Sequence, residues 1–202
     1  MQSTKNKCYT RDMPNFDIFD NEEFQSAFKN QTVHVARKAA VEYDFEWDEV
    51  FKLLDIDIRD GKPCGKKRYA DGGYRILNAL RIPNVLAAHN KLLNYFKGSQ
   101  YELDVPGRSG HLYVNITTIE GTYGWIHADK ENVVFWNVKG RSKWTIYEKT
   151  DYVDPDKIPE GKVDVEVILE PGDVLFCPYD RPHKVEPLTP RFGVSLGFGE
   201  ML

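Results

Sequence analysis

The stretch LEPGDVLFCPYDRPHKVEPLTPRFGVSLGF, residues 169–198, decides the fold class. It holds short segments rich in β-branched and aromatic residues, and the turn sequences EPGD and YDRP separate them. Similar segments begin at His111, where the turns KGRS and DPDKIPEGK divide them. Several short strands at such spacing predict a β-sandwich or a β-barrel.

The first half of the chain has a different pattern. We expect helices over residues 21–29, 47–54 and 83–96, the first capped by Asn21 and the third carrying Pro83 at an early position. A strand is expected over 32–41, and a turn-rich basic loop over 60–75. The prediction is one domain over 1–202, mainly β with flanking helices. A helix-rich part, 1–100, packs outside a β core, 101–202.

Composition narrows the class of protein further. The 202 residues are 41% hydrophobic and 13% aromatic, as in an ordinary globular domain. A net charge of -4 argues against a general nucleic-acid binder and against binding to an anionic membrane. The 3 cysteines show no CxxC spacing, and no apolar stretch is long enough to span a bilayer. We therefore expect a soluble, cytoplasmic protein without a disulfide framework.

The segment His127-Ala128-Asp129 points most directly at chemistry. Residues two apart on a strand share a face, so the side chains of His127 and Asp129 can bind the same metal ion. His183, just past another apolar run, can supply a third ligand from a neighbouring strand. Two histidines and one carboxylate on one face of a metal leave the other positions open, which is typical of non-haem Fe(II) oxygenases.

A family resemblance rests on residues 120–148, EGTYGWIHADKENVVFWNVKGRSKWTIYE, followed by the stretch 169–198. In order they present HxD, the turn and strand VKGRSKWTIY, the turn and strand PGDVLF, and a distal histidine. The sequence resembles the double-stranded β-helix (jelly-roll, cupin) core of the JmjC/cupin-type 2-oxoglutarate- and Fe(II)-dependent oxygenases. The resemblance implies Fe(II) held by His127, Asp129 and His183. It also implies 2-oxoglutarate and dioxygen as cosubstrates, with hydroxylation of a C–H bond.

The far carboxylate of 2-oxoglutarate needs a fixed cation. Many JmjC-like proteins place a lysine two residues after the turn glycine, but Ser142 stands there in this chain. Lys143 follows, and one residue on a strand means the opposite face; Lys139 is a weaker substitute. Arg191, with Ser195 on the same face, resembles the prolyl-hydroxylase branch of the superfamily. We predict Arg191 with Ser195 as the anchor, ahead of Lys143.

Three further polar residues are candidates for contact with the cosubstrate. Tyr113 and Thr117 share one face of the alternating segment 111–119, although tyrosine also serves as an amphipathic wall residue. Asn132 lies near the position of a hydrogen-bonding asparagine in related enzymes, offset by one. For Asn132 the role of a turn residue before the strand is an equally good interpretation.

For the aromatic and basic residues other than His127, Asp129 and His183, we expect positions in the core or on the surface rather than a role in chemistry. Trp125, Phe135 and Trp136 are expected in the core, and Cys177 as a small core residue. The basic run over 59–75 is expected to be a solvated surface loop, with receipt of an acidic ligand as the alternative.

Other functions compatible with the pattern belong to different classes. A cupin metalloenzyme can use the same triad without 2-oxoglutarate, and a cupin-type barrel can be a non-catalytic binding protein. An interaction protein acting through the basic loop is a third alternative. Within the oxygenase interpretation, the substrate is a protein side chain or a small molecule. The lack of surplus positive charge favours hydroxylation over chromatin demethylation.

Overall fold

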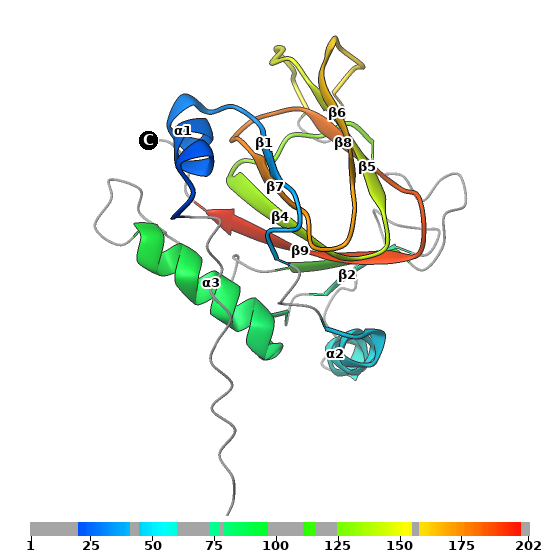
Figure 1. Ribbon diagram of the computed structural model, residues 1–202. Helices are drawn as coiled ribbons and strands as arrows, with labels where there is room; N and C mark the ends of the chain where they lie inside the picture. Colours follow the sequence, from blue (N-terminus) through cyan, green and yellow to red (C-terminus); the bar gives the residue numbers. More distant parts are fainter. Residues whose placement is uncertain are drawn as a thin grey trace, which may run out of the picture.

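Two antiparallel β-sheets form the body of the protein in the computed structural model (Figure 1). The structure describes residues 20–40, 45–59, 73–76, 79–96, 111–115, 125–154 and 158–198. The larger sheet has the strand order β1-β7-β4-β9-β3-β2, and the smaller sheet has the order β6-β5-β8. Helices pack against the outer face of the larger sheet. This confirms the predicted mainly β fold with flanking helices.

The strand bounds follow the predicted β-rich segments closely after residue 125. The larger sheet consists of β1 (His34–Ala36), β2 (Gly73–Ile76), β3 (His111–Asn115), β4 (Asn132–Lys139), β7 (Val174–Cys177) and β9 (Arg191–Phe198). The smaller sheet consists of β5 (Ser142–Tyr147), β6 (Val163–Leu169) and β8 (His183–Pro187).

The described helices are α1 (Glu22–Asn30), α2 (Trp47–Arg59), α3 (Pro83–Phe96) and the short 3-10 helix η3 (Ala79–Arg81). The cap of α1 is the predicted one: the Asn21 Oδ1 accepts the backbone N–H groups of Glu23 at 2.7 Å and Phe24 at 3.1 Å. Helix α3 has the predicted bounds. None of the described helices has the length and apolar character needed to cross a membrane.

Three predictions about the first half need correction. The strand expected over 32–41 is only β1, because the chain leaves it through a turn in which Lys38 has a positive φ of 54°. Helix α2 continues beyond 54 to Arg59, which pairs with Asp55 at 2.7 Å. The expected loop over 60–75 ends in β2, which forms because β3 offers it a partner edge. Residues 60–72 of that loop lie outside the described residues.

Two apolar cores lie on the two sides of the larger sheet. The outer core joins this sheet to the helices; Phe24 and Phe28 of α1 lie 5.5 and 5.7 Å from Phe176 between ring centroids. The inner core lies between the sheets and consists of Val133, Phe135, Trp144, Ile146, Leu169, Leu175 and Cys177. On β4, therefore, Val133 and Phe135 point into the barrel, whereas Val134 and Trp136 point toward the helices. The inner face is where the candidate site lies.

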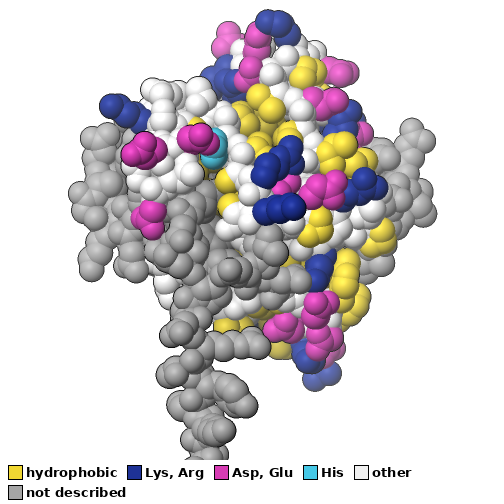
Figure 2. All heavy atoms as spheres, in the orientation of Figure 1, with side chains coloured by type: hydrophobic (Ala, Val, Ile, Leu, Met, Phe, Trp, Pro, Cys, Tyr) yellow, Lys and Arg dark blue, Asp and Glu magenta, His cyan; other side chains and the backbone are white. Residues whose placement is uncertain are grey.

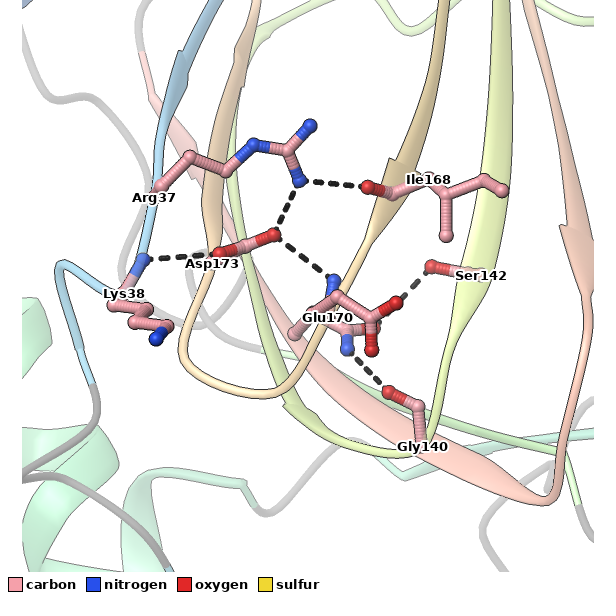
Figure 3. A network of polar contacts seen from close by, with 8 residues as sticks. Arg37, Lys38, Gly140, Ser142, Ile168, Glu170 and Asp173 are labelled. Atoms are coloured by element: carbon pink, nitrogen blue, oxygen red, sulfur yellow. Dashed lines mark hydrogen bonds and ion pairs between the residues drawn. The ribbon is translucent and has the colours of Figure 1, made fainter.

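A buried carboxylate fastens β1 to the barrel (Figure 3). The Asp173 side chain is 1% exposed and accepts hydrogen bonds from Arg37 Nη1 at 2.6 Å, from the Lys38 N–H at 2.9 Å and from the Glu170 N–H at 2.9 Å. Arg37 Nη1 also donates to the Ile168 carbonyl at 2.7 Å, so it bridges β1 to the edge strand β6. The aspartate of the PGDVLF motif thus connects the edges of the two sheets.

We expect Asp173→Asn to destabilise the protein by about 2–3 kcal/mol, because it weakens charge-assisted hydrogen bonds around a buried group. Urea unfolding followed by circular dichroism measures the change. The matched control is Asp48→Asn, which removes an exposed carboxylate paired with Lys52 at 2.8 Å and should leave stability unchanged. Equal urea midpoints for Asp173→Asn and the wild type would contradict this role.

Candidate metal centre

The backbone brings the two candidate histidine ligands together. His127 and His183 form an isolated antiparallel bridge, in which the His127 N–H donates to the His183 carbonyl at 3.0 Å. The His183 N–H donates back to the His127 carbonyl at 2.8 Å. The Asp180 N–H also donates to the Asp129 carbonyl at 2.9 Å. Backbone hydrogen bonds therefore join the segment 127–129 to the segment 180–183 at both of its ends.

The side chains of His127, Asp129 and His183 converge as the spacing predicts. One ligand atom from each lies within 4.8 Å of the other two. His183 Nε2 lies 3.7 Å from Asp129 Oδ2, and the two imidazole centroids are 4.4 Å apart. His183 is buried, whereas the Asp129 side chain is 38% exposed. The group therefore sits at the rim of the barrel, with two nitrogen donors and one oxygen donor beside solvent.

Backbone carbonyls orient both imidazole rings. His127 Nδ1 donates to the Trp125 carbonyl at 3.0 Å, and His183 Nδ1 donates to the Arg181 carbonyl at 2.9 Å. A carbonyl only accepts, so each Nδ1 carries a proton, and in the neutral ring Nε2 is then the nitrogen whose lone pair can bind a metal. In both cases the acceptor lies two residues before the histidine. Nε2 is thus the nitrogen that each ring offers to a metal.

Burial controls the protonation of the groups around His183. Burial, together with the nearby His127, lowers the pKa of His183 to about 4, although Asp129 acts in the opposite direction. The imidazole is therefore neutral at pH 7. Cys177 Sγ lies 3.9 Å from His183 Nδ1, the nitrogen that does not face Asp129, and burial raises the pKa of this thiol. Cys177 is a buried core residue, as predicted, and its thiol is protonated at pH 7.

The inner face of β9 carries the predicted anchor. A side chain at Gly193 would overlap the ring of Phe135, so Gly193 faces the barrel interior. Arg191 and Ser195 lie two residues to either side and share that face. Arg191 is 5% exposed, and its guanidinium carbon lies 5.7 Å from the Phe135 ring centroid. A buried guanidinium and a hydroxyl therefore line the same wall.

The lysines of the β4–β5 turn point elsewhere. Ser142 is buried, and its hydroxyl donates to Asn137 Oδ1 at 3.2 Å. Lys143, on the opposite face of β5, forms an ion pair with Glu166 at 2.8 Å, and Lys139 pairs with Glu46 at 2.9 Å. The structure brings neither lysine to the inner face beside Arg191. Figure 2 shows positive and negative side chains interspersed over the smaller sheet, where Lys143 and Glu166 lie.

The remaining candidates separate into different positions. Tyr113 packs against the inner core and is paired with Gly193 of β9, so it lines the barrel. Thr117 lies outside the described residues. Asn132 is buried on the face opposite Val133, and its Oδ1 accepts the Tyr179 N–H at 2.9 Å. This hydrogen bond gives Asn132 a structural role in holding the turn before His183, and its contact with a cosubstrate stays a prediction.

Two findings at the rim were not predicted. Trp125 was expected in the core, but its side chain is 53% exposed. Its backbone carbonyl, rather than its ring, contacts the candidate metal site, since it accepts the hydrogen bond from His127 Nδ1. Lys130, Tyr152 and Asp180 form a polar cluster next to Asp129. Their separation along the chain gives no spacing signal, so only the fold reveals the cluster.

Two antiparallel sheets packed over an inner core, with two histidines and an aspartate at the rim, define a cupin-type barrel with a candidate mononuclear metal site. Residues 109–201 match the family model of the JmjC domain. No curated protein matches the chain.

Solved structures agree with this assignment of the fold. The chain is similar to the X-ray structure of E. coli ycfD with a TM-score of 0.61 and 16% identity, over 89% of this chain and 53% of that one. It is also similar to YcfD described as a ribosomal oxygenase from Escherichia coli in complex with cobalt and 2-oxoglutarate. That match has a TM-score of 0.60 and 16% identity, and covers 88% of this chain and 52% of that one. The chain spans about half the length of these structures.

Proposed function

We propose that the protein is a 2-oxoglutarate-dependent non-haem Fe(II) oxygenase of the hydroxylase type. The observation that carries the proposal is the convergence of His127, Asp129 and His183 within 4.8 Å, with both imidazoles oriented by carbonyls. Two neutral imidazoles and one carboxylate on one side of an ion suit Fe(II) and leave positions for cosubstrates. The match of residues 109–201 to the family model of the JmjC domain supports the same chemistry.

The chemistry that bound Fe(II) would supply is oxidation of a substrate C–H bond to an alcohol by dioxygen, coupled to conversion of 2-oxoglutarate into succinate and carbon dioxide. The protein's own residues contribute binding and orientation. His127, Asp129 and His183 would hold the ion. Their positions at the rim would leave it accessible to a substrate arriving from solvent.

Arg191 is proposed to bind the far carboxylate of 2-oxoglutarate. A guanidinium offers a planar pair of donors that matches a carboxylate, and burial strengthens such a contact. Ser195 would add a hydroxyl from the same face of β9, and Tyr113 would form part of the wall. YcfD is described with cobalt and 2-oxoglutarate, which supports a pocket for this cosubstrate in a barrel of the same fold.

The proposed substrate is a protein side chain or a small molecule in the cytoplasm. YcfD is described as a ribosomal oxygenase, which favours a macromolecular substrate over a small molecule for a barrel of this kind. Whether this chain acts on a polypeptide is decided by assaying candidate proteins and metabolites for the addition of one oxygen atom by mass spectrometry.

The test of the proposed function is anaerobic reconstitution with Fe(II), addition of 2-oxoglutarate, and admission of oxygen. We expect 2-oxoglutarate to bind only when the metal is present, and slow succinate formation to follow oxygen even without the main substrate. A sample kept in excess chelator is the control. Metal binding without any binding of 2-oxoglutarate would contradict the proposal and would indicate a cupin metalloenzyme that does not use this cosubstrate.

A further inference from the structure

Three side chains interlock at the rim of the barrel beside Asp129. Lys130 Nζ lies 2.6 Å from Asp180 Oδ1 and donates to the Tyr152 hydroxyl at 2.7 Å. The Tyr152 hydroxyl in turn donates to Asp180 Oδ1. We call Lys130, Tyr152 and Asp180 the rim clasp. It joins three segments: the one after Asp129, the β5–β6 connection and the turn before His183.

The rim clasp lies on the two segments that carry the proposed metal ligands. Lys130 is the neighbour of Asp129, and the Asp180 N–H donates to the Asp129 carbonyl at 2.9 Å. Asp180 adopts a left-handed conformation with φ 57°, which costs a non-glycine residue about 1 kcal/mol or more unless contacts hold it. The side-chain bonds from Lys130 and Tyr152 supply such contacts. The clasp therefore stabilises the turn that meets the Asp129 backbone.

Charge-assisted hydrogen bonds hold the rim clasp together. The hydrogen bonds that Lys130 donates to Asp180 and Tyr152 raise its pKa. Although burial opposes it, hydrogen bonds from Lys130 and Tyr152 lower the pKa of Asp180. Lys130 Nζ also lies 4.9 Å from the Tyr152 ring centroid and 5.8 Å from that of Tyr179, within reach of both aromatic faces. The lysine and the aspartate are thus both charged.

Asp129 needs this support more than the two histidines do. Carbonyl groups orient both imidazoles, and His183 is buried. The Asp129 side chain is more than one-third exposed, and within the described ranges no hydrogen bond fixes the direction of its carboxylate. Its position depends on its backbone, which the turn at Asp180 holds.

We propose that the rim clasp positions Asp129 for metal binding and that Tyr152 is its central positioning residue. Tyr152 comes from the β5–β6 connection, next to the fully exposed Val153, so the clasp also ties this surface connection to the metal centre. The inference rests on the proposed function, because it concerns the affinity of the same metal site.

The first test is titration of the full chain with Co(II), followed through its visible d–d absorption. We expect Tyr152→Phe and Lys130→Met each to weaken Co(II) binding by about 10- to 100-fold, the range typical of outer-shell partners. A changed band shape should accompany the loss, whereas a merely structural role would move the thermal midpoint and leave the bands unchanged. Tyr179→Phe is the matched control, because it keeps the ring near Lys130. Wild-type affinity in Tyr152→Phe would overturn the proposal.

The second test needs no metal and separates failure of the clasp from failure of the proposed function. Hydrogen exchange of the metal-free protein reports on the Asp180 amide, whose N–H is bonded to the Asp129 carbonyl. We expect Tyr152→Phe to speed this exchange by about tenfold, as loss of one charge-assisted hydrogen bond implies. Exchange in β4 should not change. If the wild type binds no Co(II), the proposed function fails; if the Asp180 amide exchanges at an unchanged rate, the clasp fails.

Discussion

Replacement of Arg191 by methionine is expected to weaken 2-oxoglutarate binding by about 30-fold or more while Fe(II) still binds. The physical reason is that a buried carboxylate without its guanidinium partner loses a charge-assisted pair worth about 2–5 kcal/mol. Methionine keeps a side chain of similar length against the Phe135 ring, so the barrel wall stays filled. Anaerobic titration of the Fe(II)-loaded protein with 2-oxoglutarate measures the change.

Lys143→Met is the matched control for the anchor. Lys143 lies on the outer face of the smaller sheet and pairs with Glu166, so its loss should leave 2-oxoglutarate binding within about twofold of the wild type. If Lys143→Met abolished binding while Arg191→Met preserved it, the assignment of the anchor to β9 would be wrong. Loss of binding in both variants with a lowered thermal midpoint would indicate damage to the fold instead.

Removal of the carboxylate ligand by Asp129→Ala should have the second large effect. We expect the loss of Fe(II) affinity to exceed the roughly 10- to 100-fold typical of outer-shell residues, and succinate formation to fall below detection. Asp129 is a better target than His183 because it is partly exposed, whereas the His183 ring is buried and stacks on Trp144 at 5.3 Å between centroids. Isothermal titration with the metal and a succinate assay measure the two effects.

The control for Asp129→Ala is Asp151→Asn, which removes an exposed carboxylate from the β5–β6 connection. Iron affinity should be unchanged in this variant. Retention of wild-type affinity by Asp129→Ala would mean that the two histidines do not form a site with this carboxylate, and the metal centre would need a different assignment.

The sequence predicted those elements whose bounds depend only on their own residues and on the turns beside them. The strand β9 and the helix α3 have the predicted bounds, because alternation or helical spacing there is bordered by turn residues and proline. The triad was predictable for the same reason: His127 and Asp129 are two residues apart on an extended segment. The distal histidine follows a turn that the resemblance to JmjC-type barrels places beside them.

The features that sequence reasoning missed depend on partners far along the chain. Strand β2 exists because β3 pairs with it, and its own residues GGYRI resemble a turn. The face of the sheet on which Asn132 lies follows from the register of β4. A prediction that is offset by one residue places the side chain on the opposite face of the sheet. The rim clasp joins residues from three separate segments, so neither periodicity nor motif spacing indicates it.

The bridge between His127 and His183 bears on which ion the site admits. Because the two histidines are direct cross-strand partners, hydrogen-bonded backbone sets the separation of their Nε2 atoms, and that separation resists adjustment. At the proposed metal site, ions of different radius would then be accommodated mainly by a shift of Asp129, whose side chain is 38% exposed. First-row divalent ions differ in affinity for such donors, and supply in the cell contributes to which one is loaded. Selectivity at the proposed centre would therefore depend on how far one carboxylate can move.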